Sequence, residues 1–139
     1  MLTLSLLRHA KSSWADPELD DHERPLAKRG VKAIPALAKF MRQEKLRPSL
    51  VLCSDAMRTR ATLALLLAEL GPPTPRVIYD DVLYLASPEI ILADVRARGS
   101  VALNTYVLSA WKRGQRTRSD QSDYQEFRAD VLVMIAELE

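Results

Sequence analysis

Apolar positions along the first hundred residues alternate between short continuous runs and sets spaced as in a helix. The stretch Leu2–Ala10 begins as a buried strand, and Leu50–Cys53 has the continuous apolar character of a strand in a parallel sheet. Arg76–Tyr79 predicts a brief third strand at a sheet edge. Between these runs the pattern predicts three helices, over about 30–42, from Ser54 or Asp55 to about Leu70, and from Ser87-Pro88-Glu89 onward.

This alternation of strands and helices predicts an α/β fold in which helices flank a parallel-type sheet in three layers. Two of its parallel strands, near residues 2–8 and 50–54, are expected to lie side by side. Residues 14–24 form a polar loop between the first strand and the first helix. At 139 residues the chain has the length of one domain, which is expected to span residues 1–139. The sequence has no internal repeat and no low-complexity linker.

The last third of the chain is harder to interpret. Residues 101–110 mix apolar and polar positions and could form a strand ending at Trp111. Asp123 and Glu126 resemble a helix N-terminus. The apolar residues that follow have helical spacing and predict an amphipathic helix to the C-terminus: Phe127, Val131, Met134, Ile135 and Leu138.

The amino-acid composition argues against several classes of function, among them nucleic-acid binding and zinc binding. A net charge of +2 is too small to favour nucleic acid or a membrane as partner, and the basic stretch Lys112–Arg118 reads as a solvated loop. The single cysteine, Cys53, lies in an apolar run and is expected to be a buried, inert thiol of a cytoplasmic protein. With only two histidines, His9 and His22, and one cysteine, a zinc site is not expected. No other metal and no cofactor is expected either.

Candidate chemistry gathers where two of the predicted strands end. Arg8 and His9 follow the first strand, and Arg58 falls on the first turn of the helix after the second strand. An open α/β sheet binds ligands at this edge, and two guanidiniums around an imidazole would form an anion site. Taken alone, Arg58 reads better as an exposed helix-surface arginine than as a site residue. Arg60 is a rival on the same turn that points to a different face.

Four segments along the chain form a recognisable series of motifs: Leu7–Trp14, Asp21–Leu26 with Gly30, Cys53–Asp55 leading to Arg58 and Thr62, and Asp80-Asp81 with Leu83-Tyr84. These motifs and their order resemble the histidine phosphatase superfamily, in particular its small SixA-type phosphohistidine phosphatases. The resemblance covers residues 1–98, whereas 99–139 diverge, and the chain is shorter than family members usually are. The fold it implies is phosphoglycerate mutase-like, with a C-terminal third that could be incomplete.

The resemblance implies that His9 is a nucleophile that carries the phosphoryl group as a phosphohistidine intermediate. Arg8 and Arg58 would hold the phosphate oxygens, with Ser12 and Arg24 also placed in substrate binding. For Arg24 a structural role or a place at the site rim is as plausible as substrate contact. The substrate would be a phosphorylated small molecule or a phosphohistidine protein. His22, in the same loop as Arg24, reads as a solvated histidine.

Two departures from the family pattern leave other interpretations open. The family usually has a second histidine after a later strand, but no histidine follows His22 here. Many relatives carry a glutamate where this chain has Leu85, and the spacing of Asp80 and Asp81 does not support a simple replacement. A deletion, a frame disruption or a divergent C-terminal half would each account for the missing histidine. The alternatives are a catalytically impaired module that binds phosphate or a phosphoprotein, and a non-functional remnant.

Overall fold

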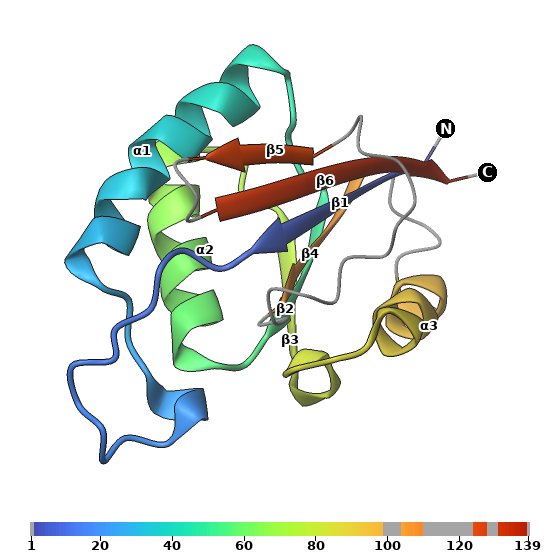
Figure 1. Cartoon of the computed structure of the whole chain (residues 1–139). Coiled ribbons are helices and arrows are strands. Elements are labelled where there is room, and N and C mark those ends of the chain that lie inside the picture. The colour runs from blue at the N-terminus through green and yellow to red at the C-terminus, as the bar shows by residue number, and fades with distance from the viewer. Residues whose placement is uncertain (1, 99–103, 110–123, 128–130, 139) are drawn as a thin grey trace.

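The computed structural model describes residues 2–98, 104–109, 124–127 and 131–138 (Figure 1). Three α-helices and two short 3-10 helices surround one six-stranded sheet in this part of the chain. The helical elements are η1 (Asp21–Glu23), α1 (Lys28–Gln43), α2 (Met57–Leu70), η2 (Asp81–Leu83) and α3 (Pro88–Arg98). The strands are β1 (Leu2–Arg8), β2 (Leu50–Ser54), β3 (Arg76–Asp80), β4 (Asn104–Ser109), β5 (Tyr124–Phe127) and β6 (Val131–Leu138).

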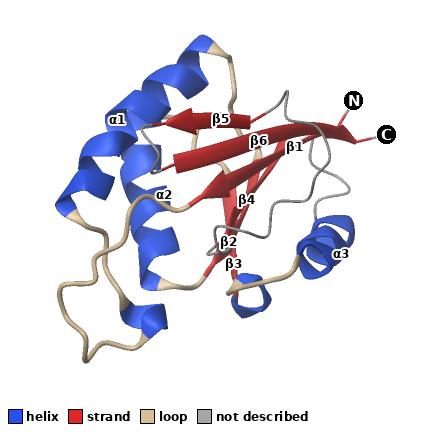
Figure 2. Cartoon of the chain, in the orientation of Figure 1, coloured by secondary structure: helices blue, strands red, loops and turns tan. Residues whose placement is uncertain are grey.

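The helices lie on both faces of the sheet, as the strand and helix pattern predicts. Figure 2 shows α1 and α2 together on one face and α3 on the other. Side chains of β1 and β2 alternate between the two faces, so Leu7, Val51 and Cys53 pack with α1 and α2. Leu4, Leu50 and Leu52 pack on the opposite side, with Ile91 and Val95 of α3. The three-layer α/β architecture predicted from the sequence is therefore confirmed.

The expected adjacency of the first two strands is wrong. The sheet order is β3-β2-β4-β1-β6-β5, so β4 lies between β1 and β2 and pairs in parallel with both. Strands that are consecutive in the sequence lie side by side in only roughly two thirds of cases. Here the strand that separates β1 from β2 comes from the last third of the chain. Because β1 and β2 remain parallel, their carboxyl ends still point to the same edge of the sheet. The edge position predicted for Arg76–Tyr79 is confirmed by β3.

The predicted C-terminal helix is also wrong. Residues Val131–Leu138 form β6, which pairs antiparallel with β1 from Leu2↔Leu138 to Leu7↔Val133. Glu126, expected near a helix start, lies in β5. The physical reason is that Val131–Ile135 is an unbroken apolar run, and such a run suits a strand within a sheet as well as a helix. The strand expected within 101–110 is confirmed as β4, whereas Trp111, the basic stretch Lys112–Arg118 and Asp123 lie outside the described residues.

The capping residue predicted for α3 is confirmed, whereas the caps predicted for the N-terminus of α2 are not. Ser87 caps α3, since its Oγ accepts a hydrogen bond from the backbone N–H of Ile90 at 3.3 Å. α2 ends at Leu70 as expected, but Ala56 occupies its N-cap position and no side chain caps it. Ser54 belongs to β2 instead, and the Asp55 carboxylate is taken by His22. None of the described helices is both long and apolar enough to cross a bilayer.

Candidate active site

His9 lies directly after β1 and is almost fully buried, with 7% of its surface exposed. Its Nδ1 is 2.7 Å from the carbonyl oxygen of Ala10, so Nδ1 carries the proton and donates it there. The lone pair of the neutral ring is then on Nε2. The Ala10 N–H donates to Thr62 Oγ1 at 3.0 Å, and that hydroxyl donates to the carbonyl of Arg58 at 2.7 Å. These bonds fix the turn that carries His9 against the first turns of α2.

The surroundings of His9 keep its ring neutral. Burial is the largest effect and lowers the pKa of His9 from 6.5 to about 4, although the bond to Ala10 opposes it. The positive charges of Arg58, Arg8 and Arg24 lower the pKa further. Three guanidiniums therefore act on His9 through space. The structure thus brings together the histidine and the arginines expected from the sequence, at the carboxyl edge of β1 and β2.

Arg58 is not an exposed helix-surface residue, because only 3% of it is exposed. Its NH2 donates to Asp21 Oδ2 at 2.9 Å, and its NH1 donates to the Asp21 backbone oxygen. Arg60 differs, since it is exposed and lies over the ring of Tyr79 with 4.6 Å from its Cζ to the ring centroid. The sequence prediction that Arg60 points to another face is confirmed, and Arg58 is the helix arginine that reaches the site.

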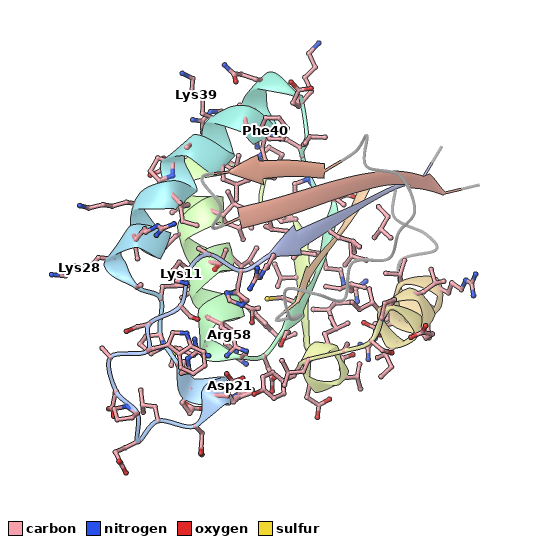
Figure 3. All side chains as sticks on the ribbon, viewed as in Figure 1. Lys11, Asp21, Lys28, Lys39, Phe40 and Arg58 are labelled. Atoms are coloured by element: carbon pink, nitrogen blue, oxygen red, sulfur yellow. The ribbon has the colours of Figure 1, made fainter. Side chains whose placement is uncertain are left out.

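Asp21, in η1, is a site residue that sequence reasoning missed. Figure 3 shows Asp21 next to Arg58. The Asp21 carboxylate accepts hydrogen bonds from Arg24 NH1 at 2.7 Å and from the Tyr84 hydroxyl at 2.6 Å, in addition to Arg58. Burial alone would raise the pKa of Asp21, but the bonds from Tyr84, Arg58 and Arg24 lower it to about 2. The sequence did contain a signal for Asp21, because Asp21 and Tyr84 both fall inside the motifs that resemble the family. In addition, Asp21 lies three residues before Arg24, a spacing at which a carboxylate and a guanidinium can form an ion pair.

Arg24 and Ser12 hold the loop that borders the site. Arg24 Nε donates to the carbonyl of Ser13 at 3.1 Å, and its NH2 donates to Ser12 Oγ. The exposed ring of Trp14 covers the guanidinium, with 3.3 Å from Arg24 Cζ to the ring centroid. With NH1 bound to Asp21, all three guanidinium nitrogens of Arg24 and the Ser12 Oγ are hydrogen-bonded within the protein. The structure therefore gives Arg24 the structural role that the sequence left open, while its charge still reaches His9.

His22 is held between two carboxylates and is not simply a solvated loop residue. Its Nε2 lies 2.9 Å from Asp55 Oδ1 and its Nδ1 lies 3.1 Å from Glu23 Oε1, while Tyr84 packs edge-on at 4.9 Å between ring centroids. The bond to Asp55, followed by that to Glu23, raises the pKa of His22. This contact joins the 14–24 loop to the turn between β2 and α2. Arg58 follows this connection, in the first turn of α2.

Of the two acidic residues near the expected glutamate position, Asp80 is held by contacts of its own. Asp80 is buried and forms an ion pair with Arg98 of α3, and its Oδ1 accepts from the Val82 N–H at 3.1 Å. Leu85 is partly exposed, at 38%, and has a positive φ of 51°. The sequence conclusion that Asp80 does not simply replace the glutamate agrees with this placement. Among the described residues, no cluster of three or more potential ligands could hold a metal ion.

Comparisons with known proteins agree with this site. The sequence model of the histidine phosphatase superfamily (branch 1) matches residues 4–83, and the chain belongs to this superfamily. An uncharacterised chloroplastic protein of Arabidopsis thaliana is 50% identical over 60 residues, which cover 43% of this chain and 28% of that protein. An uncharacterised protein of Mycobacterium leprae is 33% identical over 106 residues, covering 74% of this chain and 63% of that protein. The chain thus spans less than two thirds of the length of these relatives.

The fold also matches solved structures of SixA proteins. A candidate phosphohistidine phosphatase SixA from Agrobacterium tumefaciens superposes with a TM-score of 0.69 at 28% sequence identity. The match covers 78% of this chain and 68% of that one. The fold predicted from the sequence, and its likeness to the SixA branch, are therefore confirmed.

Proposed function

We propose that this chain is a phosphatase that uses His9 as its nucleophile and prefers phosphoryl groups bound to nitrogen, such as that of phosphohistidine. The observation that carries the proposal is the state of His9. Its ring is buried and neutral, its Nε2 has the lone pair, and three arginines act on it electrostatically. Membership in the histidine phosphatase superfamily supports the same chemistry.

In the first step, Nε2 of His9 attacks the phosphorus atom and the bond from phosphorus to the leaving nitrogen breaks. The leaving imidazole departs with the proton it carries, so its nitrogen leaves neutral. In the second step, water attacks the phosphorus of phospho-His9, the bond to Nε2 breaks, and inorganic phosphate is released. The guanidiniums of Arg8 and Arg58 would stabilise the charge on the phosphoryl oxygens during both transfers.

Asp21 leaves part of Arg58 available for this task. A guanidinium has five N–H donors in a planar fork, and Asp21 accepts from NH1 and NH2 of Arg58 at one end of the fork. The Nε–H side of the fork is not used by that contact. Asp21 would therefore hold the guanidinium in a fixed orientation while the Nε side binds phosphate.

The preference for phosphorus–nitrogen bonds follows from the residue at position 85. Leu85 cannot donate a proton, and Asp80 is engaged with Arg98. An alkoxide or phenoxide leaving group needs a proton donor more than an imidazole that is already protonated. The SixA name of the structural relative that is 28% identical supports the same substrate class.

A second candidate is a module that binds a phosphorylated ligand without hydrolysing it. It is favoured by one specific observation, namely that the sequence contains no histidine after His22. Loss of one preorganised donor typically lowers a catalytic rate by about 10²–10³. Binding would survive such a loss better than turnover, because Arg8 and Arg58 remain.

The two candidates are separated by measuring phosphate release from phosphohistidine and from an aryl phosphate, with His9→Ala as the blank. We expect slow release from phosphohistidine, slower release from the aryl ester and none from the variant. A preference for the aryl ester would contradict the proposed mechanism. Absence of release from both substrates would favour the binding module.

Anion binding can be tested separately by calorimetry with orthovanadate. Arg58→Ala should weaken binding, whereas Arg60→Ala, a change of the same size and charge on the same helix, should not. Arg60 is the matched control because it is exposed and faces Tyr79. Equal vanadate affinity in the two variants would remove Arg58 from the site.

A further inference from the structure

The first long helix carries a one-sided charge that the proposed chemistry does not use. α1 contains five basic and no acidic residues over its 16 positions. The whole chain has a net charge of only +2, so the remainder is net acidic. α3, in contrast, mixes both signs, with Glu89 and Asp94 beside Arg96 and Arg98. The basic residues of α1, all exposed, are Lys28, Arg29, Lys32, Lys39 and Arg42.

Four of these residues form a stripe along the solvent side of α1. At 3.6 residues per turn, Lys28, Lys32, Lys39 and Arg42 fall within a sector of about 80°, and they span about 21 Å of helix. We call this set the α1 stripe. Figure 3 shows Lys28 and Lys39 pointing away from the sheet. The opposite side of α1 is apolar and packs in the core through Ala33, Ile34, Leu37, Ala38 and Met41.

The stripe does not stabilise the helix. Lys28 stands at the N-terminus of α1, where the helix dipole disfavours a cation, and Lys28 and Lys32 are like charges four residues apart. Within the described residues, no salt bridge involves Lys28, Lys32 or Lys39. Arg42 donates to the carbonyl of Glu69, so it also ties α1 to the end of α2. The three lysines are thus available to a partner.

The stripe begins next to the segment that carries His9. Gly30, in the first turn of α1, packs so closely on the backbone of Lys11 that a Cβ at Gly30 would lie 2.3 Å from the Lys11 carbonyl oxygen. The Ala27 N–H donates to the same oxygen at 2.8 Å. Lys11 is only two residues beyond His9, its side chain is exposed, and its backbone packs on the first turn of α1, where Lys28 lies. A ligand on the stripe would therefore end beside the candidate active site.

We propose that the α1 stripe binds an acidic segment of a phosphorylated protein and so guides its phosphohistidine to His9. The identity of the phosphoryl group rests on the proposed function, whereas the acidic partner rests on the stripe alone. A protein partner suits the stripe better than nucleic acid, since four cations on a chain with a net charge of only +2 make too small a basic footprint for nucleic acid. No exposed aromatic residue accompanies them on α1 to stack on bases.

The test uses fluorescence anisotropy with two labelled peptides, one of alternating Glu and Ala and one of alternating Gln and Ala. The variant Lys32→Glu/Lys39→Glu reverses two stripe charges in the helix interior. Arg76→Glu/Arg96→Glu makes the same net change at exposed positions on β3 and α3 and is the matched control. We expect the Glu peptide to bind the parent in a salt-dependent manner, and the stripe variant to bind it about tenfold more weakly. The control should stay within about twofold of the parent.

Several results would overturn the proposal. These are equal binding of both peptides, equal losses in the two variants, or tighter binding of a DNA duplex than of the Glu peptide at physiological salt. Self-association of the parent that is lost in the stripe variant would instead make a second copy the occupant.

Turnover of a small phosphoramidate, measured on the same samples, separates this proposal from the proposed function. It should be equal in the parent and both variants, because none of the changed residues is in the site. If the parent does not hydrolyse the phosphoramidate, the proposed function fails, and the peptide binding still decides the role of the stripe.

Discussion

Burial of neutral His9 should make the protein lose stability in mild acid. The pKa of His9 is lowered to about 4 in the folded state, whereas an unfolded chain has the ordinary value of 6.5. Between these values the unfolded state binds more protons, so the free energy of unfolding falls as the pH drops from about 6.5 to 4. Integrating this difference between pH 7 and pH 4.5 gives a loss of about 2 kcal/mol from His9 alone.

The assay is urea unfolding of the parent and of His9→Gln at both pH values. Carboxylates contribute equally to the two proteins, so the difference between their pH dependences isolates His9. We expect the parent to lose about 2 kcal/mol more than His9→Gln. His22 provides a control of opposite sign, since its raised pKa stabilises the folded state at low pH. His22→Gln should therefore enlarge the acid loss, and an identical pH dependence in the parent and His9→Gln would refute the reasoning.

Three further predictions concern the support of the site. Gly30→Ala should cost about 1–3 kcal/mol in urea unfolding, because its Cβ would overlap the Lys11 carbonyl; an unchanged midpoint would contradict the close packing. Asp21→Asn should cost about 1 kcal/mol at pH 7, discounted because the carboxylate side chain is 43% exposed, and no loss would show that its three bonds contribute little. Cys53, fully buried with its pKa raised to about 12, should react with a thiol reagent only in urea; prompt labelling without urea would contradict its burial.

The sequence was informative where local signals and tertiary structure agree. Up to Arg98, apolar spacing and capping residues place the strands and helices within a few residues of their observed bounds. In the last third the pattern predicted the strand β4 but failed for Val131–Leu138, because the decisive contacts of that segment are long-range. β6 pairs with β1 across nearly the whole chain, and nothing within Val131–Leu138 indicates that partner. Insertion of β4 between β1 and β2 is equally invisible to local patterns.

The candidate site shows the same division. His9, Arg8 and Arg58 could be predicted because strand ends and the family motif mark them. The burial of Arg58 could not, since it depends on Asp21, 37 residues earlier in the chain. The contacts of His22 with Asp55 and of Tyr84 with Asp21 also join distant segments. Only the tertiary structure brings such pairs into contact, and local patterns in a single sequence do not predict which distant residues will meet.

The most direct test of the central claim is to trap the phosphorylated protein. The parent is mixed with phosphoramidate, quenched in alkali, digested, and examined by mass spectrometry, with His9→Ala treated in parallel. We predict one phosphoryl group on the peptide that contains His9, stable in alkali and lost in acid, and none in the variant. A phosphoryl group on another residue, or phosphate release that continues in His9→Ala, would contradict the assignment of His9 as the nucleophile.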